Sequence, residues 1–192
     1  MKVLIIAATD FEVNSEKIRE FTLLISGVGM VNTAINLTKE LLKNDYDLVI
    51  NMGVAGSFSE DISLGEVVEV IDERFSEIGF EDGNTFKEFT GLNICNSYKV
   101  EGKTNLKKVK SITVNTVHGN ENSIQEIVKR LNPDVESMEG AAVFQVCENL
   151  GVPCVQIRSI SNKVEVRNKE NWNLDLAIFN LNKEVEKYID SL

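Results

Sequence analysis

The sequence has few of the residues that mark several protein classes. Its 192 residues include two prolines, three cysteines, one histidine and one tryptophan. The cysteines (Cys95, Cys147 and Cys154) have no metal-ligand spacing, and the last two lie in apolar segments. We therefore expect buried, unreactive thiols in a reducing compartment rather than a disulfide framework.

Acidic residues outnumber basic ones, 30 to 20, and long apolar runs are scarce. The net charge is −10, and the one basic cluster (Lys107, Lys108 and Lys110) is most simply a solvated surface turn. Without a basic stripe to displace counterions from phosphates, nucleic acid is excluded as a partner. The run at 3–8 is too short for a signal sequence, and none reaches membrane-spanning length. We expect a cytoplasmic protein without a membrane partner, folded as a single domain over residues 1–192.

Hydrophobic periodicity divides the chain into alternating strands and helices. Runs rich in β-branched residues, or with alternating apolar residues, predict strands at 3–8, 21–25, 47–52, 65–71, 111–117 and 154–160. Apolar residues at helical spacing predict helices at 31–42, 124–131, 138–150 and 172–189. Segment 72–101 is polar, and we expect loops and short strands there. This alternation is typical of an α/β domain with a largely parallel sheet.

Several polar or glycine residues directly follow predicted strands. In parallel sheets ligands bind outside the carboxyl ends of the strands. Ser26, Gly53, His118 and Ser161 occupy such positions, so we expect them to converge on one rim.

Two glycine-containing turns, 26–29 and 53–56, close predicted strands. Glycine permits positive φ and close backbone approach to a ligand. The dinucleotide fingerprint would require a glycine at position 32, where Asn32 stands, and no Walker-type lysine follows. A Rossmann cofactor site is disfavoured, and the turns fit tight strand exits as well as ligand loops.

Two glutamates are candidates for chemistry. Glu12 follows the first strand, and Glu139 begins the helix predicted from Met138. Both could simply be helix-start acids favoured by the macrodipole. Alternatively, Glu12 is a general base that activates water, and Glu139 accepts hydrogen bonds from the two vicinal hydroxyls of a ribose.

Two cationic or titratable side chains need partners. Arg158 lies within an apolar strand, and Glu136 or Glu139 could pair with it. A structural ion pair is favoured slightly over direct ligand contact. His118 is the one histidine, and we interpret it as an ordinary polar residue rather than a catalyst.

The order of these motifs resembles the nucleoside phosphorylase and methylthioadenosine/S-adenosylhomocysteine (MTA/SAH) nucleosidase superfamily. The resemblance rests on Glu12, turn 26–29, segment 51–56, the pair Met138–Glu139, and Arg158 with Ser161. Within it, the chain is most similar to the futalosine hydrolases. That narrower resemblance rests on segments 77–83, 113–117, 136–142 and 160–167, with Trp172.

The resemblance implies a three-layer α/β/α sandwich with a mixed sheet, and a homodimer that cleaves an N-ribosidic bond without metal or cofactor. By the same resemblance, Glu12 activates water, Met138 packs under the ribose, Glu139 holds its hydroxyls, and position 162 contacts the purine edge around N7. The residues expected to line the substrate site with Met138 are Gly53, Val54, Val117, Ser137, Arg158 and Ser161.

The residue at position 162 predicts which purine base the enzyme releases. In the adenine-cleaving relatives this position is Asp, whereas this chain has Asn162. An amide offers two donors, which suit the acceptors N7 and O6 of a 6-oxopurine. We therefore predict hydrolysis of a 6-oxopurine nucleoside, in particular futalosine, releasing hypoxanthine and dehypoxanthine futalosine for menaquinone biosynthesis.

Water is the expected nucleophile. Phosphorylases of the superfamily hold phosphate with Arg and Ser around the second glycine turn, where this sequence has Asn51 and Val54 and no neighbouring Arg. The alternatives are a purine nucleoside phosphorylase, an adenine-specific nucleosidase of the MTA/SAH type, and a nucleoside-binding regulatory domain without turnover.

Lys163, Arg167 and Trp172 could bind the aromatic carboxylate tail of futalosine by ion pairing and stacking. A surface loop whose tryptophan packs the last helix onto the sheet is an equally good interpretation.

Overall fold

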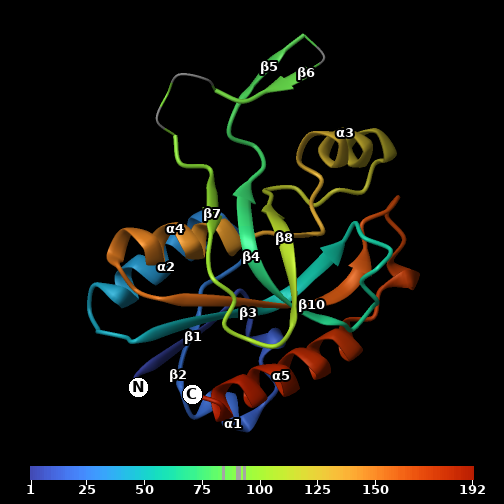
Figure 1. Ribbon diagram of the computed structural model, residues 1–192. Helices are drawn as coiled ribbons and strands as arrows, with labels where there is room; N and C mark the ends of the chain where they lie inside the picture. Colours follow the sequence, from blue (N-terminus) through green and yellow to red (C-terminus); the bar gives the residue numbers. More distant parts are fainter. Residues whose placement is uncertain (84, 90–91, 93) are drawn as a thin grey trace.

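A mixed β-sheet organises the chain in this computed structural model, which describes residues 1–192 except 84, 90–91 and 93 (Figure 1). The strands are β1 (Val3–Ala7), β2 (Thr22–Ile25), β3 (Leu48–Ser57), β4 (Val67–Phe75), β5 (Phe80–Asp82), β6 (Thr85–Lys87), β7 (Ser97–Lys99), β8 (Lys107–Thr113), β9 (Val135–Ser137) and β10 (Cys154–Lys163).

The main sheet has the order β10-β4-β8-β9-β3-β1-β2, with β7 paired to β4. A direct pairing of β10 with β3 closes β10, β4, β8, β9 and β3 into a ring. Pairings β10–β4, β3–β9 and β4–β7 are antiparallel, and the others in this sheet are parallel. The ring matters because it places the end of β3 between the end of β10 and β9.

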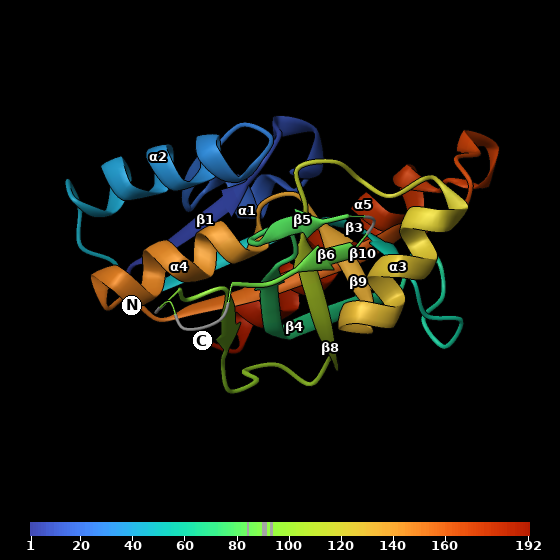
Figure 2. The same ribbon diagram turned by 90° about the horizontal axis from the view of Figure 1, so that it is seen from above.

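Helices cover both faces of the sheet. They are α1 (Glu16–Arg19), α2 (Met30–Leu41), α3 (Glu121–Leu131), α4 (Gly140–Leu150) and α5 (Leu174–Asp190), with short 3-10 turns η1 (Asp10–Glu12) and η2 (Lys169–Asn171). Helices α2 and α4 lie side by side on one face, and α5 with α1 lies on the other (Figures 1 and 2). The predicted α/β fold, with a mixed and largely parallel sheet between helices, is confirmed.

Strand β1 shows why this sheet is buried on both faces. Successive side chains of a strand point to opposite faces, so a strand covered twice must be apolar throughout. Leu4 and Ile6 pack in the cluster that contains Phe144 of α4. Val3 and Ile5 pack in a second cluster with residues of α5, among them Leu181.

Several predicted boundaries are wrong, and the sheet explains why. The strand predicted to end at Met52 continues through the supposed glycine turn 53–56, because this segment pairs with β10 on one side and with β9 at its end. Residues 135–137 form β9, so the helix predicted from Met138 begins at Gly140. The strand predicted at 111–117 is β8, and the lysine cluster lies on it rather than on a turn.

Segment 72–101 contains the end of β4, the β5–β6 hairpin and β7, in agreement with the short strands expected there. Residues 84, 90–91 and 93 of this segment lie outside the described residues. The hairpin extends away from the main sheet (Figure 1). Cys147 and Cys154 are buried as predicted, and Cys95 is exposed.

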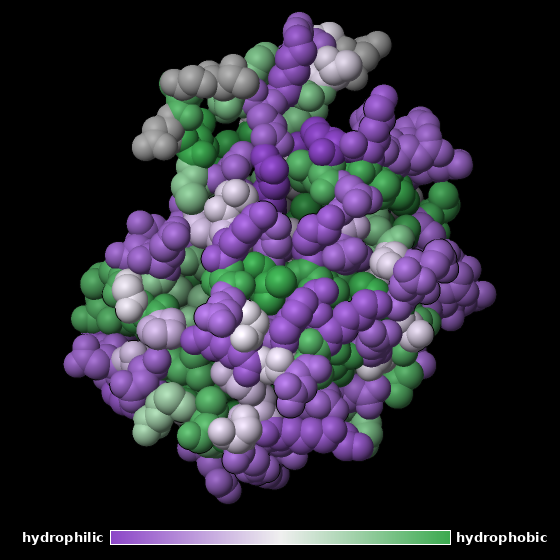
Figure 3. Space-filling model, in the orientation of Figure 1, coloured by the Kyte–Doolittle hydropathy of each residue, from purple (hydrophilic) through white to green (hydrophobic). Residues whose placement is uncertain are grey.

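The face shown in Figure 3 carries mostly hydrophilic side chains, consistent with the high charge of the sequence. Over the described residues, no helix combines the length and apolarity needed to cross a bilayer.

Candidate active site

The second half of β3 aligns the candidate residues from three parts of the chain. In the β3–β10 pairing, Arg158 lies opposite Gly53 and Asn162 opposite Gly56. The backbone N–H of Val54 donates to Glu12 Oε1 over 3.1 Å. Because a strand rises about 3.3 Å per residue, Val54 and Gly56 are ~7 Å apart along β3. Glu12 and Asn162 therefore approach neighbouring positions of one strand.

The two oxygens of Glu12 bind different parts of the chain. Its Oε2 accepts from the N–H and hydroxyl of Thr9, at 2.9 and 3.0 Å, which caps η1. Its Oε1 turns instead toward β3 and binds Val54. The side chain is buried, with its residue 8% exposed, so the carboxylate is held by fixed donors rather than by water. A fixed carboxylate at a strand edge suits a base that must stay oriented.

Glu139 sits at the N-cap of α4, where it accepts from Gly29 N–H over 3.0 Å. Gly29 is itself the N-cap of α2, with φ +92°, so its amide is available at the positive end of that helix. Burial raises the pKa of Glu139, against the lowering effects of Arg158 and the Gly29 amide, and the nearby charge of Glu12 raises it further. This coupling places Glu12, Glu139 and Arg158 in one electrostatic unit.

Arg158 is buried and lies beside Glu12. A Cβ built on Gly53 would lie 2.8 Å from Arg158 Nη1 and 2.9 Å from Glu12 Oε1, so glycine is needed for both groups to approach β3. Nη1 donates to Asn51 Oδ1 over 3.3 Å. The predicted ion pair with Glu136 is wrong, because Glu136 binds His118 instead. Glu139 acts on Arg158 through charge, and among the described residues no carboxylate oxygen lies within 4.0 Å of the guanidinium.

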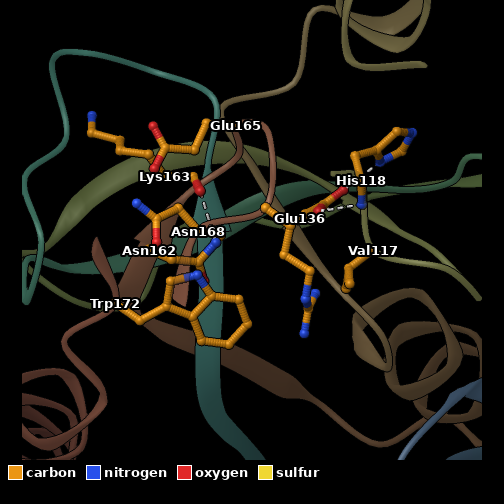
Figure 4. A pocket seen from close by; sticks show the side chains of 10 residues that line it. Val117, His118, Glu136, Asn162, Lys163, Glu165, Asn168 and Trp172 are labelled. Atoms are coloured by element: carbon orange, nitrogen blue, oxygen red, sulfur yellow. Dashed lines mark hydrogen bonds and ion pairs between the residues drawn. The ribbon is translucent and has the colours of Figure 1, made fainter. Parts of the chain in front are cut away.

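Asn162 lines a cavity at the end of β3 (Figure 4). The described residues around it include Gly56, Val117, His118 and Glu136, but not Glu139 or Glu12, which binds Val54 two residues before Gly56. Ser161 Oγ donates to Asn162 Oδ1 over 2.9 Å, and Asn162 Nδ2 donates to the Lys163 carbonyl over 2.9 Å. One Nδ2 hydrogen remains for a ligand.

His118 and Glu136 form a pair in this cavity. The Glu136 Oε1 accepts from His118 N–H over 3.0 Å, and Oε2 lies 2.6 Å from His118 Nδ1. Figure 4 shows the Glu136 side chain pointing toward His118. The structure thus brings His118 into the candidate site, although the sequence favoured an ordinary polar residue.

The remaining predicted residues lie around this strand end, in different surroundings. Val117 is exposed at the cavity, whereas Ser137 and Ser161 are buried. Met138 is half-buried and packs against the apolar cluster that contains Ile112. Of the residues expected to follow strands directly, Ser26 does so, while Gly53 and Ser161 lie within β3 and β10.

Sequence reasoning missed a group of buried polar side chains behind Arg158. Asn51, Gln156 and Glu73 each lie in a strand interior and are at most 3% exposed. Asn51 and Gln156 interrupt apolar runs, which is a signal that a polar network requires them. Elsewhere in the described chain, no group of three or more His, Cys, Asp or Glu side chains is arranged to hold a metal ion.

Comparison with known proteins adds family information. A family model described as the phosphorylase superfamily matches residues 6–190. Futalosine hydrolase of Thermus thermophilus is 28% identical over 182 residues, covering 88% of this chain and 81% of the relative. An MTA/SAH nucleosidase of Marinomonas sp. is 32% identical over 171 residues, covering 82% and 74% respectively.

Solved structures share the fold at lower identity. The native structure of Helicobacter pylori futalosine hydrolase has a TM-score of 0.86 at 18% identity, and covers 100% of this chain and 98% of its own. A mutant H. pylori MTA nucleosidase with 5′-methylthioadenosine in its active site has a TM-score of 0.86 at 19% identity, with 100% and 99% coverage.

Proposed function

This chain belongs to the phosphorylase superfamily, and from that membership and the geometry of its site we propose that it hydrolyses the N-glycosidic bond of a 6-oxopurine nucleoside, in particular futalosine. Like the relatives described above, it is an enzyme of the nucleosidase class. The products would be hypoxanthine and dehypoxanthine futalosine, and the reaction would serve menaquinone biosynthesis.

The placement of Asn162 and Glu136 around Gly56 carries the choice of base. A Cβ built on Gly56 would lie 3.2 Å from Asn162 Nδ2 and 3.7 Å from Glu136 Cγ, so the Asn162 amide and the Glu136 side chain flank one point of β3. Each Glu136 oxygen already contacts His118, and a carboxylate oxygen keeps a second lone pair for a ligand. A 6-oxopurine presents the acceptor O6 beside the donor N1–H, which matches this pair. Adenine presents the reverse order, and unpaired groups would cost roughly 1–3 kcal/mol.

The carboxylates behind the base site suit the sugar. Breaking the N-glycosidic bond places positive charge on the ribose and negative charge on the leaving base. Glu139 would hold the ribose hydroxyls and stabilise the cationic sugar increasingly as the charge develops. Glu12 would take a proton from the attacking water, and Asn162 would donate to the departing purine. The charge of Arg158 lowers the pKa of Glu139, against the larger raising effect of burial.

The sequence predicts water rather than phosphate as the nucleophile because no Arg lies near the second glycine segment, and the fold corrects this reason. The sequence places no Arg next to the second glycine segment, yet the fold brings Arg158 against Gly53. A guanidinium there could attract an anion. However, Glu12 Oε1 occupies the same place, and its charge opposes phosphate binding beside it. This arrangement favours a hydrolase.

One assay tests the proposal. The protein is incubated with inosine, futalosine, adenosine and 5′-methylthioadenosine, with and without phosphate, and the released bases are separated by chromatography. We expect hypoxanthine from futalosine at a rate independent of phosphate. Ribose 1-phosphate formation would indicate a phosphorylase, and ligand binding without any base release would indicate a regulatory domain.

An adenine-specific nucleosidase is the second candidate, because the Marinomonas relative at 32% identity is an MTA/SAH nucleosidase. Faster release of adenine than of hypoxanthine in the same assay would establish it. The homodimer stays a prediction, and the exposed apolar side chains beside Gly29 support it, namely Val28, Val31 and Ile35.

A further inference from the structure

A directed chain of hydrogen bonds runs through the buried interior behind the candidate site. Gln156 Nε2 donates to Glu73 Oε2 over 2.6 Å, and Asn51 Nδ2 donates to Gln156 Oε1 over 2.8 Å. Asn51 Oδ1 in turn accepts from Arg158 Nη1 over 3.3 Å. Glu73 itself is 0% exposed. We propose that Glu73 is a positioning residue that sets the direction of this chain and thereby the orientation of Arg158.

The direction follows from the donor and acceptor inventory. A carboxylate oxygen accepts, so the group facing Glu73 must be the NH₂ end of the Gln156 amide. The Gln156 oxygen then faces Asn51 and requires its NH₂ end. This leaves the Asn51 oxygen for Arg158. One acidic group therefore fixes the orientation of two amides and presents an acceptor, rather than a donor, to the guanidinium.

A second branch of hydrogen bonds connects Glu73 to the end of α4 that carries Glu139, the acid proposed to hold the ribose hydroxyls. Thr113 Oγ1 donates to Glu73 Oε1 over 3.1 Å and accepts from Ala141 N–H over 2.7 Å. Ala141 lies in the first turn of α4, whose N-cap is Glu139. A Cβ on Gly140 would lie 2.2 Å from Glu73 Oε2, so the start of α4 rests directly on this network. Glu73 thus supports both Arg158 and the helix end that carries Glu139.

The inference rests on the proposed function, and substitution of Glu73 tests it. In Glu73→Gln the shape is kept, but an NH₂ group replaces an acceptor. If that group faces Gln156, both amides must turn over and a donor would face Arg158. If it faces the other way, it meets the Arg74 N–H, which donates to Glu73 Oε1 over 3.1 Å. We expect kcat on the fastest-cleaved nucleoside of the panel to fall on the order of tenfold, with KM little changed.

The double variant Glu73→Gln, Gln156→Glu is the matched rescue. It keeps the net charge, and Glu at position 156 accepts from both Gln at 73 and Asn51, so Arg158 regains its acceptor. We expect near wild-type kcat. A folded double variant as slow as Glu73→Gln would overturn the proposal, and so would a double variant that does not fold, because the swapped chain satisfies every donor.

Glu69→Gln is the control. Glu69 lies on the same strand and is also buried, but its carboxylate binds the N–H groups of Lys103 and Thr104 and the ammonium of Lys108 rather than the Glu73 network. We expect a lower Tm with unchanged kcat. Crystal structures give a readout independent of turnover: the Arg158 guanidinium should turn in Glu73→Gln and return in the double variant. A wild-type protein inactive on the whole panel defeats the proposed function, whereas an active Glu73→Gln with Arg158 in place defeats only this inference.

Discussion

The two ends of the candidate site are built differently. At the sugar end, Glu12 and Glu139 are held by backbone N–H groups, and Arg158 is held by a buried network within strands. At the base end, Asn162 and His118 are partly exposed and lie beside chain connections. The groups proposed for the chemistry are therefore held by buried donors, whereas the residues proposed to contact the base are partly open to solvent.

The strongest test of the sugar end is removal of the proposed general base, Glu12. In Glu12→Gln the bond from Val54 can persist, but the proton acceptor is lost. We expect kcat to fall by roughly 10²–10⁴-fold, the usual contribution of a positioned general base. Glu16→Gln, an exposed acid of the neighbouring helix α1, is the control and should leave kcat unchanged. Steady-state kinetics on the cleaved nucleoside measures both. A fully active Glu12→Gln would exclude this role.

At the base end, Asn162→Asp should change which purine is cleaved. A carboxylate facing O6 places two acceptors opposite each other without a hydrogen between them, a penalty equivalent to roughly 5- to 150-fold in relative kcat/KM. The ratio of futalosine to 5′-methylthioadenosine hydrolysis should shift toward the adenine nucleoside by this factor. Asn168→Asp makes the same charge change elsewhere on the cavity wall and should leave the ratio alone. An unmoved ratio in Asn162→Asp would remove the basis for a 6-oxopurine substrate.

The raised pKa of Glu139 predicts that kcat/KM depends on pH through this residue of the sugar end. If the ionised carboxylate holds the ribose, kcat/KM should fall about tenfold per pH unit below a pKa higher than the ordinary glutamate value. Because the folded state favours the protonated acid, the stability contributed by Glu139 is present at low pH and is lost as the pH rises through the folded pKa. Activity and this stability contribution therefore change in opposite directions.

Arg158→Gln sharpens the pH measurement. Its positive charge lowers the pKa of Glu139, so its loss should move the acid limb of the pH–rate profile to still higher pH. An acid limb at the same pH in wild type and Arg158→Gln would show that another group controls it.

Two glycines three residues apart on β3 allow a matched comparison of the ends. In Gly53→Ala the new methyl group would meet Arg158 and Glu12. Overpacking costs about 1–3 kcal/mol, and because these two groups must move to relieve it, we expect kcat to fall. In Gly56→Ala it would lie 2.9 Å from Val164 Cγ2 and 3.2 Å from Asn162 Nδ2, so KM should rise instead. If both variants changed kcat, or both changed KM, the proposed separation of chemistry at the sugar end from recognition at the base end would be contradicted.

The smallest effect concerns the outer edge of the base end. Arg167 Cζ lies 5.1 Å from the centroid of the Trp172 ring. If the two bind an anionic group on the 5′ side of the substrate, Trp172→Ala should raise KM for futalosine by roughly two- to fivefold, the usual strength of an exposed cation–π contact. KM for inosine, which lacks that group, is the internal control. Equal changes for both substrates would assign Trp172 to packing.

Much of the fold follows from local patterns. The apolar run in β1 and the helical spacing in α2 and α5 predict these elements within a few residues, because burial on one or two faces dictates the period. The errors fall where pairing overrides local preference. Segment 53–56 resembles a turn by composition, but the neighbouring strands β10 and β9 supply its hydrogen bonds and make it a strand.

The identity of the chemical groups is likewise a property of the sequence. Glu12, Glu139 and Asn162 can be chosen from motif order, and their donor and acceptor inventories define the proposed reaction. Which groups meet is a property of the tertiary structure. The β3–β10 register brings Arg158 to Gly53, and the β3–β9 pairing brings Glu136 to Gly56, although these partners are about 80 to 105 residues apart. Side-chain periodicity reports burial along one segment, whereas the register between distant strands depends on how the whole core packs.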